Sequence, residues 1–286
     1  MNSRIAGFTL IELVITMTIT VIVVAFAGLF FSGPVRGFND QVRRAELVDA
    51  ADSALRRMQR DIRRALPNSV RVTTSGSVSA LEILNTVEGV RYRSGPPPGS
   101  DSTWLTFAED DDSFNSIGQF DAISKPFSST SHYLSIYNVG VAGANAYNLT
   151  DVITPTGTQI DIAVAAEAGE DNIQLNPPFE FAYPSPRQRV YLIDSPVSYL
   201  CDTATGQLTR YSGYTIASSQ SDRDSAAELL GAGASDSVMS EYLSACTFTY
   251  TPGTAQRAAL VTLSLTLTQD SENIRLLQQV HIDNVP

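Results

Sequence analysis

The chain has 286 residues, of which 43% are hydrophobic and 17% charged, and its formal net charge is −11. This composition favours a folded chain over an intrinsically disordered one. The charge is unevenly distributed, because residues 1–66 carry +3 and residues 67–286 carry −14. Because residues 67–286 are so acidic, they repel phosphate groups, and we therefore expect no nucleic acid among the partners.

The N-terminal region predicts a membrane-spanning helix. Residues 8–31 contain a single ionisable side chain, Glu12. At about 1.5 Å per residue these 24 positions reach roughly 36 Å, enough to cross a hydrocarbon core about 30 Å thick. A secretory signal peptide would have a shorter apolar core that ends in a small-residue cleavage site. A plain anchor would not carry Glu12, because an unpaired carboxylate at depth costs on the order of 3 kcal/mol.

The junction before this run carries a specific motif. Residues 7–13, Gly-Phe-Thr-Leu-Ile-Glu-Leu, resemble the class III prepilin signal of type IV pilins and type II secretion pseudopilins. The resemblance implies that a prepilin peptidase cleaves after Gly7, on the cytoplasmic side, and methylates the new N-terminal Phe8. It further implies that Glu12 pairs with the Phe8 amine of a neighbouring subunit. Such pairing removes two charges that hydrocarbon penalises and favours one docking register.

Two signals disagree about orientation. Arg36, Arg43 and Arg44 follow the apolar run and only Arg4 precedes it, so the positive-inside rule alone would place the N-terminus outside. The cleavage motif implies the opposite, because the peptidase acts on the cytoplasmic side. We follow the motif and expect a single-pass inner-membrane protein with a periplasmic head, which is later carried to the base or tip of a pilus.

Residues 32–66 predict an amphipathic continuation of the helix. Apolar residues recur every three or four positions and arginines occupy the other faces. Pro67 ends the pattern, because the residue before a proline avoids the helical region. The arginines form either a solvated face or pairs with acidic groups of the head or of neighbouring subunits. Within a filament we expect bending or melting at Gly28, Gly33 and Pro34.

After Pro67 the period changes to two, which predicts a β-rich head over residues 67–286 with an insertion around 100–185. The alternation is cleanest over residues 261–267. The fold class is therefore α+β, with a long N-terminal transmembrane and amphipathic helix packed on an antiparallel sheet; residues 1–7 are the leader. The expected strands are 69–73, 78–84, 87–93, 103–108, 132–140, 159–164, 172–175, 189–194, 197–202, 207–211, 242–250, 260–268 and 273–282.

Cys201 and Cys246 are the two cysteines of the chain. An even count is compatible with one disulfide or with two buried thiols. The export of the head that the resemblance implies favours the disulfide.

Residues that could support catalysis or bind a metal are few. His132 and His281 lie in strand-like segments, where a side-chain hydrogen bond is the commoner role, and we expect neither an enzyme nor a cofactor. Clustered carboxylates favour hard cations, but the one acidic run lacks the ligand spacing and glycine of a known calcium loop. A solvated loop is the alternative to a Ca²⁺ site. The run consists of Glu109, Asp110, Asp111 and Asp112.

Three stretches, residues 65–72, 189–192 and 279–286, resemble one subfamily. It is the MshO subfamily of the mannose-sensitive haemagglutinin pilus, which is akin to the PilW minor pilins and the J pseudopilins. The resemblance implies a minor pilin that helps to initiate or cap pilus assembly. Its partners would be prepilin peptidase, other major and minor pilins, and the inner-membrane assembly platform. The alternatives are a J-like pseudopilin of type II secretion and a tip-displayed adhesin module that uses the insertion.

Overall fold

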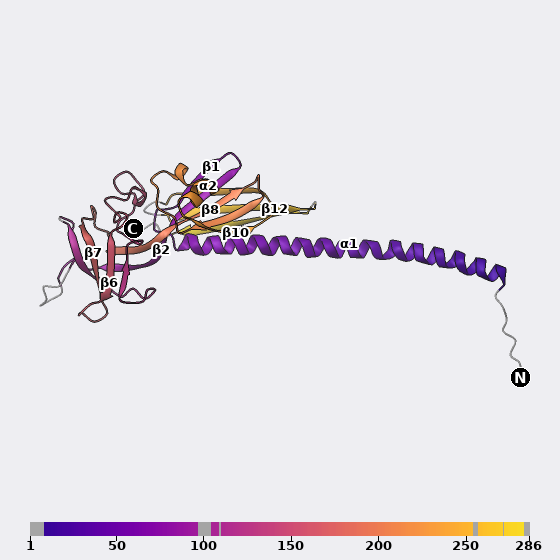
Figure 1. The fold of residues 1–286 in the computed structure, drawn as a ribbon, viewed down its shortest axis with the longest axis horizontal. Helices are drawn as coiled ribbons and strands as arrows, with labels where there is room; N and C mark the ends of the chain where they lie inside the picture. The colour runs from indigo at the N-terminus through magenta and orange to yellow at the C-terminus, as the bar shows by residue number, and fades with distance from the viewer. Residues whose placement is uncertain (1–8, 97–103, 109, 254–256, 271, 283–286) are drawn as a thin grey trace, which may run out of the picture.

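The computed structural model describes residues 9–96, 104–108, 110–253, 257–270 and 272–282. Figure 1 shows one long helix whose C-terminal half lies along a β-rich head, while its N-terminal half projects away from the head. The prediction of an α+β fold, with a helix packed on an antiparallel sheet, is confirmed.

The helix α1 (Leu10–Arg63) is continuous over 54 residues, which corresponds to a length of about 81 Å. It runs through Gly33 and Pro34 without interruption, and melting at these positions within a filament stays a prediction. The helix ends one turn before Pro67. Arg60 and Arg63 lie in its last turn, where positive charge complements the helix dipole.

The head contains two antiparallel sheets in the part of the chain that the structure describes. The order in the larger sheet is β10-β9-β8-β2-β3-β7-β6-β4, with β1 paired to β2 and β5 paired to β8. Its strands are β1 (Arg71–Ser75), β2 (Val78–Tyr92), β3 (Asp111–Ile117), β4 (Phe127–Ser129), β5 (Tyr133–Ser135), β6 (Gln159–Val164), β7 (Asp171–Phe179), β8 (Arg189–Asp202), β9 (Gln207–Ser212) and β10 (Ser235–Ser240). The smaller sheet consists of β11 (Leu243–Thr251), β12 (Ala259–Gln269) and β13 (Glu272–Ile282).

The main core lies between α1 and both sheets. The buried positions of α1 recur every three or four residues, and they pack against β2, β10, β12 and β13 in a core that β8 also lines. The alternation of residues 261–267 has its expected consequence, because every second side chain of this stretch is buried in the core. The buried apolar residues of the helix are Leu47, Ala51, Ala54, Leu55, Met58 and Ile62.

A second core lies beyond the C-terminal end of α1. It is built from β3 to β7 and the adjoining ends of β2 and β8, which we call the distal lobe (Figure 1). The distal lobe occupies the stretch where the sequence predicts an insertion around 100–185. Its fully buried aromatic side chains are Tyr92, Phe114, Phe120 and Phe181.

The long strands β2 and β8 connect the two cores. The sequence pattern predicts two strands in place of each, and this part of the prediction is wrong. In β2 the register shifts between Asn85 and Glu88, yet the pairing with β8 continues on both sides of the shift. Pro196 lies within β8, between the residues that pair with β5 and those that pair with β9. Neither strand needs a hydrogen bond from position 196, so the missing N–H of the proline is tolerated there.

Other boundaries also differ from the prediction. Residues 104–108 contain no strand, and the predicted strand 132–140 is reduced to β5. Neither β3 nor β10 was expected, because their sequences are polar and strand pairing in the sheet overrides low propensity. In its described residues the head also contains three short helices: η1 (Ala146–Asn148), η2 (Gln220–Asp222) and α2 (Ala226–Gly231), the last with a Ser225–Glu228 capping box.

A disulfide joins the two sheets. Cys201 of β8 is bonded to Cys246 of β11, and their Cα atoms lie 6.5 Å apart, within the range for a bridge. The loop that it closes contains β9, α2 and β10. The bond therefore fixes the smaller sheet against the end of β8.

We expect the double variant Cys201→Ser/Cys246→Ser to unfold more easily than the wild type. Closing a loop with a sequence separation of 45 lowers the entropy of the unfolded chain, and its removal should cost up to about 4 kcal/mol. Denaturant unfolding of the full chain in detergent measures the loss. Reductant should destabilise the wild type and leave the variant unchanged; a wild type that is insensitive to reductant would contradict the assignment.

Candidate functional site in the N-terminal helix

The N-terminal half of α1 is an exposed apolar rod. Among the described residues, Leu10–Ala27 is the one stretch long and apolar enough to cross a membrane, with a mean hydropathy of 2.5 and no residue buried against the head. Phe26 and Phe30 expose 69% and 76% of their surface. This surface requires lipid or other apolar helices around it.

Glu12 lies in the first turn of this rod. Thr9 is the N-cap: its hydroxyl oxygen accepts a hydrogen bond from the Glu12 N–H at 3.3 Å and donates one to Glu12 Oε2 at 3.4 Å. The positive end of the helix dipole favours a carboxylate in this turn. Within the described residues the carboxylate is exposed and bonded to this hydroxyl alone, so it can accept a cationic partner from outside the chain.

The threonines of the rod satisfy their own hydroxyls. Thr16 donates to the Glu12 carbonyl at 2.8 Å, and Thr20 donates to the Thr16 carbonyl at 2.7 Å. Thr18 makes the same kind of bond to the Val14 carbonyl at 3.0 Å. Internal bonds of this kind make hydroxyls tolerable in hydrocarbon. In the span Leu10–Ala27, the Glu12 carboxylate is therefore the polar group that needs a partner.

Gly7 and Phe8 lie outside the described residues. Cleavage after Gly7 and methylation of Phe8 accordingly stay predictions from the sequence. The described chain begins at Thr9 and the helix at Leu10, so the helix cap follows the predicted cleavage position directly.

A buried carboxylate docks the other end of α1 on the head. Asp61 Oδ2 accepts hydrogen bonds from the Tyr199 hydroxyl and from Arg210 Nε, both at 2.7 Å. Arg57 lies 3.5 Å from the other oxygen. Burial and the Asp61 charge raise the pKa of Tyr199. The phenol therefore stays protonated and keeps donating to Asp61.

The arginines of α1 do not all form a solvated face. Arg43 makes ion pairs with Asp40 at 2.5 Å and with Asp270 at 2.7 Å. Asp270 lies at the turn between β12 and β13, so the pair joins this hairpin to the helix near the start of the head. Arg56 instead pairs with Asp52 of the same helix. The hypothesis of pairing with acidic groups of the head holds for Arg43, whereas Arg57 pairs with Asp61 of its own helix.

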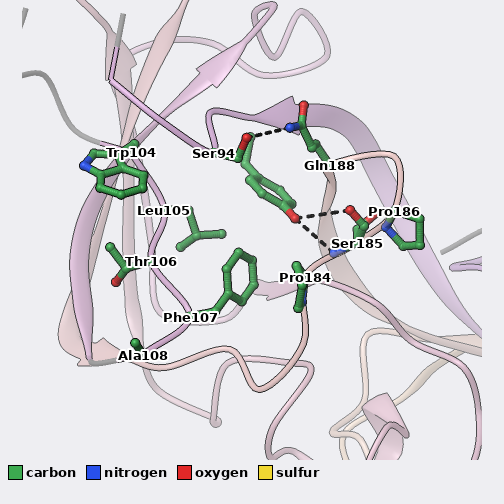
Figure 2. Close-up of a pocket in the computed structure, with 11 residues that line it drawn as sticks. Ser94, Trp104, Leu105, Thr106, Phe107, Ala108, Pro184, Ser185, Pro186 and Gln188 are labelled. Atoms are coloured by element: carbon green, nitrogen blue, oxygen red, sulfur yellow. Dashed lines mark hydrogen bonds between the residues drawn. The ribbon is translucent and has the colours of Figure 1, made fainter.

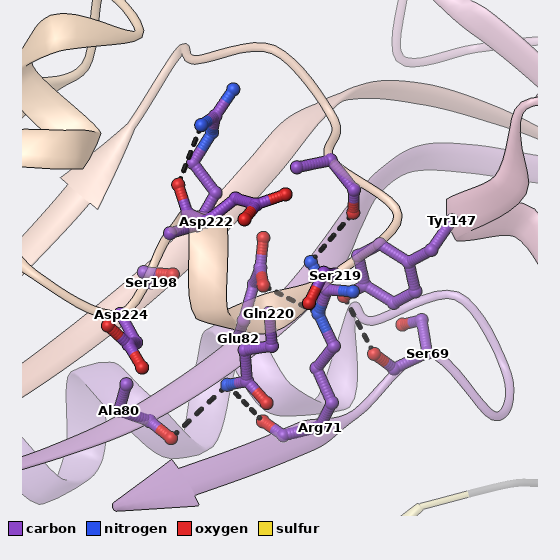
Figure 3. Close-up of polar contacts among 12 residues, drawn as sticks. Ser69, Arg71, Ala80, Glu82, Tyr147, Ser198, Ser219, Gln220, Asp222 and Asp224 are labelled. Atoms are coloured by element: carbon purple, nitrogen blue, oxygen red, sulfur yellow. Dashed lines mark hydrogen bonds and ion pairs between the residues drawn. The ribbon is translucent and has the colours of Figure 1, made fainter. Parts of the chain in front are cut away.

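A second buried charge, that of Glu82, links β1, β2 and the loop after β9 (Figure 3). Glu82 of β2 is fully buried; its carboxylate accepts from Arg71 Nε at 2.6 Å and from the Tyr214 hydroxyl at 3.0 Å. The ring of Tyr147 covers the Arg71 guanidinium at 3.6 Å, a cation–π geometry. Burial raises the pKa of Glu82, and the charge of Arg71 opposes this shift. The charged form thus depends on Arg71.

The acidic run does not form a metal site in the described residues. Glu109 lies outside them, Asp110 and Asp112 are exposed, and no group of three or more His, Cys, Asp or Glu side chains gathers there. Asp111 instead accepts bonds from the backbone N–H and the hydroxyl of Thr106, at 2.7 and 3.2 Å.

The two histidines make no catalytic arrangement with the cysteines. His132 shares a 2.7 Å hydrogen bond with Ser129 and contacts the edge of Phe127, and burial lowers its pKa. His281 is exposed on β13. Neither cysteine is free, because they form the disulfide.

Comparison with known proteins identifies a processing motif that overlaps the start of α1. A family model described as the prokaryotic N-terminal methylation motif matches residues 2–28. Searches of curated proteins and of solved structures find no match. The motif implies processing by prepilin peptidase and association with a membrane, and it supports a type IV pilin-like or pseudopilin protein.

We expect Arg71→Ala to destabilise the head by about 3–5 kcal/mol at pH 7, because it leaves the buried Glu82 charge unpaired. The raised pKa of Glu82 means that its protonated form is favoured in the fold. The stability that protonated Glu82 contributes is fully present below the pKa of an unfolded glutamate. It is lost as the pH rises through the raised pKa of Glu82 in the fold. The cost of Arg71→Ala should therefore be smaller near pH 4 than at pH 7.

Denaturant unfolding at the two pH values measures this difference. The control is Arg56→Ala, whose ion pair with Asp52 is exposed and should matter little at either pH. An equal cost of Arg71→Ala at both pH values would contradict the dependence on a charged Glu82.

Proposed function

We propose that this type IV pilin-like chain is a minor pilin of the MshO kind, which takes part in initiating or capping a pilus. The observation that carries the proposal is the exposed apolar rod of α1, with one carboxylate at its start and the methylation motif over it. A rod that stays out of the head is suited to pack among other such rods.

The chemistry of assembly follows from Glu12. Cleavage after Gly7 gives a new positive amine on Phe8, which sits on the cytoplasmic side of the membrane in the proposed orientation. When one subunit docks on another, this amine and the Glu12 carboxylate neutralise each other in an apolar setting, where an ion pair is strong and an unpaired charge costly. The pairing therefore selects one axial register between neighbours.

The shape of the head supports a subunit of low copy number. The distal lobe extends past the C-terminal end of α1 (Figure 1). In a filament built on packed N-terminal helices, a lobe in this position is unobstructed on a subunit at the tip. On an internal subunit it would have to fit beside the heads of its neighbours. We therefore favour the tip, with a role in starting or capping the fibre.

A J-like pseudopilin of a type II secretion system is the second candidate. The same motif and the same apolar helix favour it, because the prepilin signal that this chain resembles occurs in both type IV pilins and type II secretion pseudopilins. Neighbouring genes distinguish the candidates: pilus genes support the pilin, and genes for a secretin system support the pseudopilin.

We expect Gly7→Val to remain at precursor length, because a cleavage site that requires glycine rejects a branched side chain. Mass spectrometry of the membrane-bound protein measures the N-terminus, and the wild type should begin at methylated Phe8. Ala6→Val is the matched control, since it adds similar bulk one residue upstream of the cleaved bond. A mature wild-type protein with an intact Met1 would overturn the proposal.

We expect cells that lack this gene to lose surface filaments, and a plasmid copy to restore them. A Glu12→Leu copy should insert in the membrane yet enter sheared filaments about tenfold less or worse, because the Phe8 amine of its neighbour stays unpaired. Immunoblots of the sheared and membrane fractions give the ratio, and Met17→Leu on the same rod is the control. Equal incorporation of Glu12→Leu would refute the pairing, and normal piliation without the gene would refute the role.

A further inference from the structure

The distal lobe contains a pocket that membrane insertion and filament packing do not use. Its volume is about 540 Å³, within the range of roughly 300–1,000 Å³ that is typical of small-molecule sites. Figure 2 shows side chains that converge on it from the end of β2, from residues 104–108 and from the loop before β8. The distal lobe lies at the end of the head away from the N-terminal half of α1 (Figure 1).

One side of the pocket is aromatic. Trp104 is the single tryptophan of the chain and exposes 43% of its surface. Behind it the rings of Tyr92 and Phe107 lie 5.6 Å apart at an angle of 58°. Tyr92 is fixed, because its hydroxyl accepts from the Ser185 N–H at 2.9 Å and burial raises its pKa. Tyr92 itself is buried, so the indole of Trp104 is the uncharged aromatic face that the pocket exposes most to a ligand.

The opposite side carries amide and hydroxyl groups that are already held in place. Gln188 accepts from Arg91 at 2.6 Å and donates to Ser94 Oγ at 2.5 Å. Its second amide hydrogen and the Ser94 hydroxyl hydrogen form no bond among the described residues. Within the described residues both are therefore donors that an acceptor group of a ligand could use.

Thr106 adds an acceptor on a fixed loop. Its N–H and hydroxyl both donate to Asp111, which leaves the lone pairs of the hydroxyl oxygen for a ligand donor. Asp111, at the start of β3, therefore holds Thr106 in place at the pocket.

We propose that this pocket binds a neutral saccharide. The lining side chains that the structure describes carry no formal charge, so a charged ligand would find no counter-ion there. The C–H face of a pyranose ring is apolar and carries a slight positive charge, which suits the negative face of an indole. The hydroxyls at its edge both donate and accept, which matches the groups at Ser94, Thr106 and Gln188. The inference goes beyond the proposed function and does not depend on filament assembly.

The sole tryptophan lies in the pocket, so its fluorescence reports binding directly. The experiment titrates the full-length protein with glucose, galactose, mannose, N-acetylglucosamine and their disaccharides. A detergent without a sugar headgroup is required, because glycosidic detergents would compete. At least one sugar should shift the Trp104 emission to the blue and saturate. Calorimetry with the same sugar should show binding about tenfold weaker for Trp104→Ala, and weaker for Gln188→Ala.

The matched control is Tyr183→Ala, which removes an aromatic ring of equal exposure (44%) from the same lobe outside the pocket lining. It should bind like the wild type. The proposal is overturned if no sugar of the panel saturates the shift, or if Tyr183→Ala and Trp104→Ala weaken binding equally. A saturating response to a proline decapeptide, in place of any sugar, would also overturn it and assign the pocket to peptide.

Discussion

A single helix has to meet two different surroundings, and the rest of the structure follows from this constraint. Over Leu10–Ala27 the side chains of α1 point outward all round, and only lipid or other helices can cover them. From Leu47 onward one face of the same helix is buried by the head. The sequence changes accordingly, from apolar on every face to apolar on one face with charges on the others. The head is placed where the second pattern begins.

Specific placement of the head relies on buried charges more than on apolar contact. Asp61 fixes α1 to β8 and β9, and Glu82 fixes β2 to the loop that bears Tyr214. Buried ion pairs contribute little net stability, because both partners lose their hydration. They do exclude alternatives, since a helix that slipped by one turn would leave Asp61 without Tyr199 and Arg210. Apolar residues hold the helix on the head, and Asp61 determines its register.

The parts of the structure that depend on local pattern could be predicted, and the parts that depend on long-range pairing could not. The rod, its carboxylate and the alternation over residues 261–267 are visible within a few residues of sequence. The partners of Asp61 lie 138 and 149 residues away, and no local signal connects them. The strand β3 was missed because its acidic start is typical of a loop. The pocket was missed for the same reason as Asp61, because Ser94 and Gln188 meet across 94 residues.

The continuity of β2 and β8 has a mechanical consequence. A load applied to the distal lobe reaches α1 mainly through these two strands, because they connect the two cores. A load along these strands shears the hydrogen bonds between β2 and β8, so all of these bonds resist it at once. In a hairpin that is peeled apart, the bonds would instead break one after another. The Cys201–Cys246 bond keeps the loop it closes out of any extension, and that loop would otherwise release roughly 150 Å of chain. A subunit of this design can transmit tension between its outer end and the membrane rod without lengthening.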